Sequence, residues 1–192
     1  MWGFVVQITA LNLQKTSHIH NFVSMKITLL LVGKTAFPYI NEGIALYEKR
    51  LGHYINYARV EIPELKNVQA LSQEQIKERE GELILKNIKN TDDVILLDER
   101  GSTYTSLEWA AHLQKKMNYE GKDMVFVIGG AYGFSQKVYQ RANGKISLSK
   151  MTFSHQIIRV IFLEQLYRAF TIIKGEPYHH EVSDQIYDGL EF

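Results

Sequence analysis

Apolar runs of strand length recur along the chain and alternate with longer stretches that have helical spacing. The first run, KITLLLV from Lys26 to Val32, is continuous and stops at Gly33. Such a run is typical of a strand buried on both faces of a sheet. A weakly alternating run follows and ends before Pro63. We expect strands at residues 26–32, 56–62, 93–97, 124–128 and 145–148.

The stretches between these strands repeat apolar residues at the spacing of amphipathic helices. Ser72 with Gln75 three residues later has the form of a capping box, and Gly175 and Pro177 stop the last helix. We expect long helices over residues 36–54, 72–89, 105–118 and 155–173, and a short polar helix before the last strand. Strands that alternate with helices predict an α/β fold, with a mainly parallel five-stranded sheet and helices on both faces.

Glycine or small polar residues follow three of the expected strands. These segments are Asp98-Glu99-Arg100-Gly101, Gly129-Gly130 with Gly133, and Ser149-Lys150-Met151-Thr152. The carboxyl ends of parallel strands share one edge of the sheet, where ligands bind in open α/β folds. Glycines at that edge let the main chain approach a ligand closely. The sequence therefore predicts a nucleotide-type site lined by main-chain groups.

The last expected helix is apolar nearly all round. His155 and Arg159 fall on one side of it, and Glu164 and Arg168 fall on nearly the opposite side. A helix with so little polar face is usually buried. In a domain that already has helices on two sheet faces, a subunit interface is the expected cover, so we predict a homodimer.

Composition narrows the class of protein. The chain has 192 residues, a net charge of +1 and no cysteine, which excludes disulfides, thiolate chemistry and cysteine-ligated metals and suits the cytoplasm. The near-neutral charge predicts no broad basic surface. No membrane span is expected, because the most apolar long stretch contains Arg159, Glu164 and Arg168.

The chain divides into three parts by pattern. Met25 opens the first strand, so residues 1–24 are interpreted as an upstream extension, with a working N-terminal arm as the alternative. Residues 25–180 form the expected domain. Residues 181–192 carry four acidic residues and no Lys or Arg, and are interpreted as an acidic tail.

Several familiar motifs fail on inspection. Gly33-Lys34-Thr35 resembles the end of a P-loop, but Thr28 stands where the motif needs glycine. No dinucleotide fingerprint and no G-x-S-x-G elbow is present. His155, His179 and His180 lack the spacing of a zinc site, so we expect no metal.

Two interpretations of Arg168 stay open at this stage. It either pairs with Glu164 one helical turn earlier or directs its guanidinium at an anionic or carbonyl substrate group. Tyr178 and His179 follow Pro177 and have no evident packing role, which favours a functional one.

The C-terminal half resembles a known family. IGG-x-x-G, SLSKMTFSHQIIRV, EQLYRAF and the closing PYHH are together similar to the pseudouridine-N3 methyltransferases of large-subunit (23S) ribosomal RNA, which are SPOUT methyltransferases. The resemblance runs from Met25 to about His180. It implies a deep C-terminal trefoil knot, a homodimer and S-adenosylmethionine as the methyl donor. Ala131 replaces a proline of some members, and His180 replaces the usual Arg or Lys, which weakens a phosphate contact there.

The resemblance also implies roles for particular residues. Leu97 and Gly129 are expected to contact the cofactor, and the segment that follows the last strand is expected to wrap its adenosine. That segment comprises Leu148, Ser149, Lys150, Met151, Thr152 and Phe153. The positions implied around the transferred methyl group are His155, Glu164, Arg168, Tyr178 and His179.

The implied chemistry is coherent. The N3–H of an imide is a poor nucleophile until it loses its proton, which requires a base or a cation that stabilises the anion. Arg168 is the candidate stabiliser, and His179 or Glu164 is the candidate proton acceptor. Two alternatives are methylation of another RNA, such as a tRNA ribose or guanine, and a nucleotide-binding module without catalysis. Because phosphate contacts dominate the affinity for RNA, a near-neutral protein is expected to act on the assembled ribosome.

Overall fold

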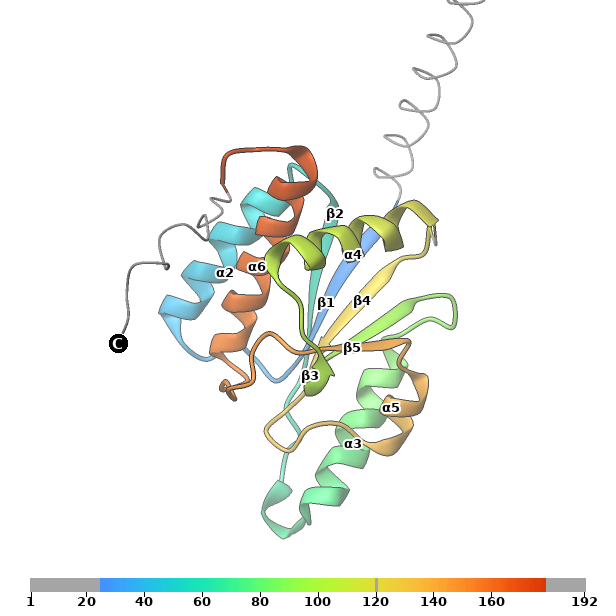
Figure 1. Ribbon diagram of the computed structural model, residues 1–192. Helices are drawn as coiled ribbons and strands as arrows, with labels where there is room; N and C mark the ends of the chain where they lie inside the picture. Colours follow the sequence, from blue (N-terminus) through green and yellow to red (C-terminus); the bar gives the residue numbers. More distant parts are fainter. Residues whose placement is uncertain (1–24, 120, 179–192) are drawn as a thin grey trace, which may run out of the picture.

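The computed structural model describes residues 25–119 and 121–178, and these are built on one five-stranded sheet (Figure 1). The strand order is β2-β1-β4-β3-β5, and every neighbouring pair is parallel. The strands are β1 (Lys26–Val32), β2 (Asn56–Ile62), β3 (Asp93–Ser102), β4 (Met124–Ile128) and β5 (Gly144–Ile146). The predicted α/β fold with a five-stranded parallel sheet is therefore confirmed.

Helices cover both faces of the sheet (Figure 1). On one face α6 packs against both α2 and α4, and on the other face α3 packs against α5. The α-helices are α2 (Pro38–Leu51), α3 (Gln73–Lys86), α4 (Ser106–Tyr119), α5 (Gln136–Arg141) and α6 (Ile157–Lys174), and a short 3-10 helix, η1, spans Val68–Ala70. In the part of the chain that the structure describes, no helix is long and apolar enough to cross a membrane.

The two faces of the sheet bury separate cores, and this explains the continuous apolar runs. In β1, Leu29 and Leu31 point into the core beneath α2, α4 and α6, where they join Phe162. Leu30 points the other way and packs with Ile84 of α3. Because successive side chains of a strand alternate between faces, a strand buried on both sides must be apolar throughout.

Local sequence signals set several helix ends. The Ser72 hydroxyl accepts a hydrogen bond from the Gln75 N–H (3.2 Å), and the Ser72 N–H donates to the Gln75 side chain (2.9 Å), which completes the predicted capping box. Gly175 ends α6 in the left-handed conformation (φ 68°), which glycine adopts without steric cost.

Several element boundaries differ from the sequence prediction: α2 and α3 are shorter than expected, and β5 ends at Ile146 instead of Leu148. Two further differences concern β3 and the last helix. β3 continues to Ser102 instead of stopping at Leu97, because both residues register with Ile146 of β5 and the residues between them bulge outward. The Ser147 N–H donates to the Ser102 carbonyl (2.9 Å) and holds this second contact. The last helix starts two residues later than expected, although Ser154 still caps the turn before it by accepting from the Ile157 N–H (3.3 Å).

Candidate active site

A cavity of about 770 Å³ lies where the bulged segment of β3 meets the loops after β4 and β5. The loops that the sequence singled out as a ligand edge therefore form one site. Of the residues predicted to contact a cofactor or the transferred group, those that line the cavity are Leu97, Gly129, Leu148, Ser149, Met151, Thr152, Phe153 and His155. Lys150 lies in the same loop but is exposed and does not line the cavity.

The glycine loop after β4 is closely packed on its outer side. A side chain at Gly129 would lie 3.0 Å from the ring of Phe134, which is buried. A side chain at Gly130 would lie 2.6 Å from a carboxylate oxygen of Glu80 on α3. Burial raises the pKa of Glu80, and the nearby charge of Glu64 raises it further. Glycine is therefore needed here to let the main chain run between the cavity and the layer beneath it.

The loop after β5 is held by its own serines. The Ser147 hydroxyl donates to the Ser149 carbonyl (2.7 Å), and the Ser149 hydroxyl accepts from the Met151 N–H (2.9 Å). These bonds fold residues 147–151 into a compact turn along the cavity wall. Met151 and Phe153 are 77% and 42% exposed, so this wall offers an apolar surface to whatever enters or covers the cavity.

The bulge in β3 contributes a polar wall. The Arg100 N–H donates to one carboxylate oxygen of Asp98 (2.8 Å), and the Tyr139 hydroxyl donates to the other. Burial and this contact with Asp98 raise the pKa of Tyr139 to about 12, so its phenol stays protonated at neutral pH. The bond joins β3 to α5 across 41 positions of the chain and fixes the position of Asp98 relative to α5.

A buried arginine anchors the segment that leads from the cavity into α6. Arg159 is fully buried, and its guanidinium donates to the carbonyls of Val32 and His155 (2.9 Å each) and to the Thr35 hydroxyl (2.8 Å). The neighbouring Gln156 side chain bonds to the backbone of Lys34 and Ala36 at 3.1 and 3.0 Å. The loop after β1 and the start of α6 are therefore locked together beside the cavity.

His155 faces the cavity in an environment that keeps it neutral. Burial lowers the pKa of its imidazole, the charge of Arg159 lowers it further, and Glu64 opposes the shift. A neutral imidazole can either accept or donate a hydrogen bond, and it adds no positive charge to the site.

The other predicted catalytic residues form a separate cluster on α6. Arg168 donates to one oxygen of Glu164 through Nε (3.0 Å) and Nη2 (2.5 Å), and the Gln165 amide donates to the other oxygen (2.7 Å). Tyr178 donates to Glu164 (3.4 Å), and its ring lies 5.0 Å from the Arg168 guanidinium carbon. Of the two interpretations of Arg168, the ion pair with Glu164 is therefore present in the structure. Burial raises the pKa of Tyr178.

Aromatic side chains of α6 and of the turn after α2 hold the end of the described chain against this cluster. Tyr167 packs edge-on against Tyr178 (4.8 Å between ring centroids) and against Tyr54 (5.8 Å). The Arg50 guanidinium lies 5.4 Å from the Tyr167 ring, and the Tyr54 hydroxyl donates to Glu176. Tyr178 is therefore fixed from several sides.

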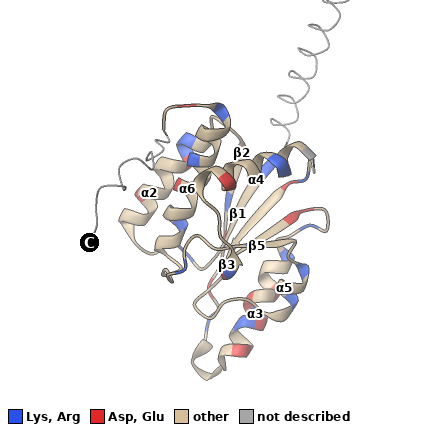
Figure 2. Cartoon of the chain, viewed as in Figure 1, with Lys and Arg blue, Asp and Glu red and all other residues tan. Residues whose placement is uncertain are grey.

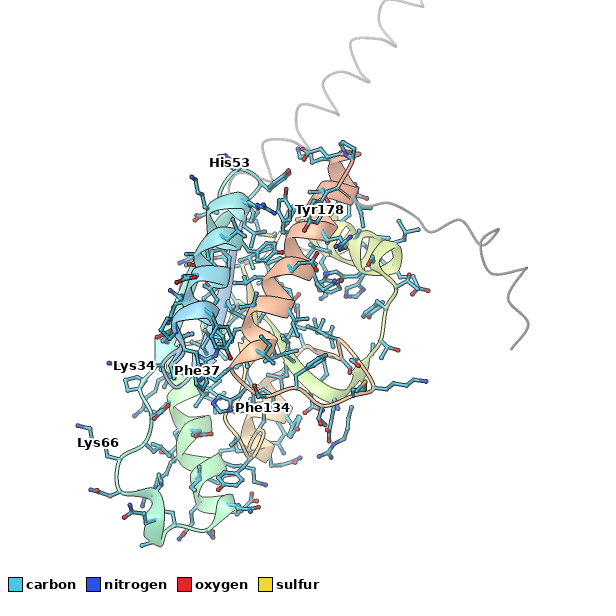
Figure 3. The ribbon with its side chains drawn as sticks, turned by 90° about the vertical axis from the view of Figure 1, so that its left-hand side faces the viewer. Lys34, Phe37, His53, Lys66, Phe134 and Tyr178 are labelled. Carbon is cyan, nitrogen blue, oxygen red and sulfur yellow. The ribbon has the colours of Figure 1, made fainter. Side chains whose placement is uncertain are left out.

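The cavity and the α6 cluster lie at opposite ends of that helix. Figure 3 labels Phe134, which packs beneath Gly129, and Tyr178, and the two lie far apart in that view. Ile158 lines the cavity, and Arg168 lies ten residues further on, which is about 15 Å along a helix. One chain therefore does not bring these predicted residues to its own cavity. His179 and His180, together with residues 1–24 and 181–192, lie outside the described residues.

Comparison with known proteins decides the family. A family model described as "Predicted SPOUT methyltransferase" matches residues 25–179. The chain belongs to the SPOUT methyltransferase family. Relatives named "Ribosomal RNA large subunit methyltransferase H" are 55% identical in Parabacteroides distasonis and 56% identical in Bacteroides thetaiotaomicron, each over 157 residues. Both alignments cover 82% of this chain and 100% of the relative.

Three supports of the candidate site were not predicted from the sequence. Arg159 was seen only as a charge on α6, the contact of Glu80 with Gly130 joins residues 50 positions apart, and Tyr139 carried no signal at all. An arginine within an otherwise apolar helix was the one available hint. Within the described residues no group of three or more His, Asp or Glu side chains is placed to hold a metal ion.

Proposed function

We propose that this protein uses S-adenosylmethionine to methylate N3 of a pseudouridine in the 23S rRNA of the large ribosomal subunit. The observation that carries the proposal is the cavity walled by the β3 bulge and two loops at the carboxyl edge of the sheet, in a chain whose relatives are named as large-subunit rRNA methyltransferases. Those relatives match over their whole length.

The cavity suits the proposed cofactor. Its volume of about 770 Å³ lies within the range of small-molecule sites, which is 300–1,000 Å³. Main chain at Gly129 and the loop after β5 offers the amide and carbonyl groups that recognise an adenine edge, and Leu97 and Leu148 supply apolar walls. When bound, S-adenosylmethionine supplies an electrophilic methyl group on a sulfonium. Because His155 is neutral, it does not repel the positively charged sulfonium.

The α6 cluster supports an assignment of roles on the substrate. Both oxygens of Glu164 are already engaged by Arg168 and Gln165, so Glu164 orients the guanidinium and is a poor proton acceptor. Arg168 then stabilises the anion that forms at N3 and its neighbouring carbonyl oxygens. Tyr178, held as a protonated phenol, donates a hydrogen bond. We therefore assign the role of proton acceptor to His179, the other candidate.

A homodimer would unite the two halves of the site. Because the cluster of one chain lies about 15 Å along α6 from its own cavity, it serves catalysis only at the cavity of a second copy. Phe37, Met151 and Phe153 are 47%, 77% and 42% exposed, and a second copy is the cover that this proposal gives to these apolar side chains. The trefoil knot that the family resemblance implies belongs to the same proposal.

The substrate is proposed to be the assembled ribosome, reached in the cytoplasm. Figure 2 shows Lys and Arg interspersed with Asp and Glu over the elements. Without a broad basic surface, affinity for naked RNA is small, because phosphate contacts supply most of it. Recognition of a shaped ribosomal surface needs less charge.

Methyl transfer to ribosomes from a strain that lacks this enzyme is the direct test. Mass spectrometry of the 23S rRNA should find one N3-methylpseudouridine after incubation with S-adenosylmethionine. Arg168→Ala should transfer about 10²–10³ times more slowly in single turnover, with cofactor affinity unchanged. Methylation of tRNA alone, or none, would refute the proposal.

A mixing experiment tests the shared site. Arg168→Ala and Gly129→Val are each expected to be inactive, one in catalysis and the other in cofactor binding. Mixed dimers would hold one intact site, so an equal mixture that exchanges subunits should recover about a quarter of the wild-type activity. No recovery despite exchange, measured with differently tagged chains, would place both residues in one site.

A further inference from the structure

Tyr132 is a large aromatic side chain held out at the rim of the cavity. It is 47% exposed and lines the cavity together with the glycine loop that carries it. Within the described residues it makes no hydrogen bond and no ring contact. Exposed aromatic side chains at a ligand site are a frequent means of recognising flat ring systems.

The turn that carries this ring is rigid. The Gly133 N–H donates to the Gly130 carbonyl (3.2 Å), these two residues form a bridge, and Gly133 has a φ of 82°. On the far side of the turn, Phe134 and Ser135 are buried, and Ser135 caps α5. A ring on a fixed turn loses little conformational entropy when another ring stacks on it.

Cations from two other elements line the same cavity. Arg100, on the bulge of β3, is exposed, and its guanidinium makes no ion pair within the described residues. Lys77, on α3, pairs with Glu74 of the same helix, and both line the cavity. A stacking ring between positive side chains is the usual composition of a surface for single-stranded nucleic acid.

We propose that Tyr132 is a stacking platform for a base of the rRNA next to the modified nucleotide, and that Arg100, which lines the same cavity, contacts the phosphate. The proposal rests on the proposed rRNA methyltransferase function and adds a substrate-binding residue to it. The residues assigned to the donor site lie on β3, at Gly129 and in the loop after β5, and Tyr132 is not among them. The Tyr132 ring is therefore available to stack on a base of the RNA.

The test measures ribosome methylation kinetics, cofactor affinity and binding of a short single-stranded RNA. Tyr132→Ala should raise KM for ribosomes about 5- to 150-fold, the range expected for one lost base–aromatic stack, and weaken RNA binding similarly. Tyr132→Phe and Tyr132→Trp keep a ring and should behave like the wild type. Arg100→Ala should reduce the salt dependence of RNA binding by about one unit of slope.

Tyr104→Ala serves as the matched control, because Tyr104 is also exposed but lies outside the cavity. It should leave all three measurements unchanged. If Tyr132→Ala methylates ribosomes with the KM and the RNA binding of the wild type, the stacking proposal is overturned and the proposed function stands. A loss of cofactor affinity would move Tyr132 to the donor site. If ribosomes are not methylated but RNA binding still needs the ring, the proposed function fails and the stacking surface stands.

Discussion

Replacement of Arg159 by methionine separates the buried structural arginine of α6 from Arg168, the arginine that we propose to be catalytic. Arg159 is fully buried and bonds to Val32, Thr35 and His155, whereas the Arg168 side chain is 26% exposed and bonds to Glu164. Methionine fills much of the same volume but donates no hydrogen bond. Arg159→Met therefore removes the bonds and leaves their acceptors inside the protein.

The expected loss of stability in Arg159→Met follows from these hydrogen bonds. A hydrogen bond from a charged group contributes about 1.5–3 kcal/mol to stability. The sum over three such bonds overestimates the free energy of unfolding that the variant loses. The variant also avoids burying a guanidinium, whose desolvation already lowers the pKa of Arg159. We expect the free energy of unfolding to fall by about 3–5 kcal/mol. At this chain size the melting temperature would fall by roughly 6–20 °C.

Urea unfolding at one fixed protein concentration measures this loss, because any dimer makes stability depend on concentration. Arg168→Met is the matched control on the same helix, and a partly exposed ion pair contributes only about 0–1 kcal/mol. Arg159→Met should also weaken cofactor binding, since His155 loses its backbone anchor. Equal destabilisation by the two variants would refute the assignment of Arg159 as the buried anchor.

Three further outcomes are expected. Gly129→Val should abolish measurable S-adenosylmethionine binding in calorimetry while circular dichroism stays native, because the new side chain meets the ring of Phe134 and shifts the loop; unchanged affinity would remove Gly129 from the site. Because burial lowers the pKa of His155 from 6.5, its imidazole gains a proton only below that pH, so cofactor affinity should be constant above pH 6.5 and fall on acidification. His155→Gln should remove this dependence, and an identical pH profile would contradict the idea. Sedimentation at micromolar concentration should give twice the 22.2 kDa of one chain, and a clean monomer would exclude the shared site.

Much of the fold could be predicted from local patterns. The bounds of β1, β2 and β4 follow the apolar runs, and the capping box at Ser72 begins α3 as the sequence predicts. These features depend on residues within a few positions of one another, so periodicity and capping rules suffice to find them. The three loops at the carboxyl edge were predictable for the same reason, since parallel strands place their ends together.

The cavity and its supports were decided by contacts between distant residues. Tyr139 bonds to Asp98, Gly130 packs on Glu80, and Arg159 reaches Val32 across 127 positions of the chain. No local rule connects such pairs, because only the strand order β2-β1-β4-β3-β5 and the packing of the helices bring them together. The sequence by itself thus determined the elements and the edge at which the site lies. The tertiary structure decided which side chains hold that site and that the α6 cluster lies about 15 Å along the helix from it.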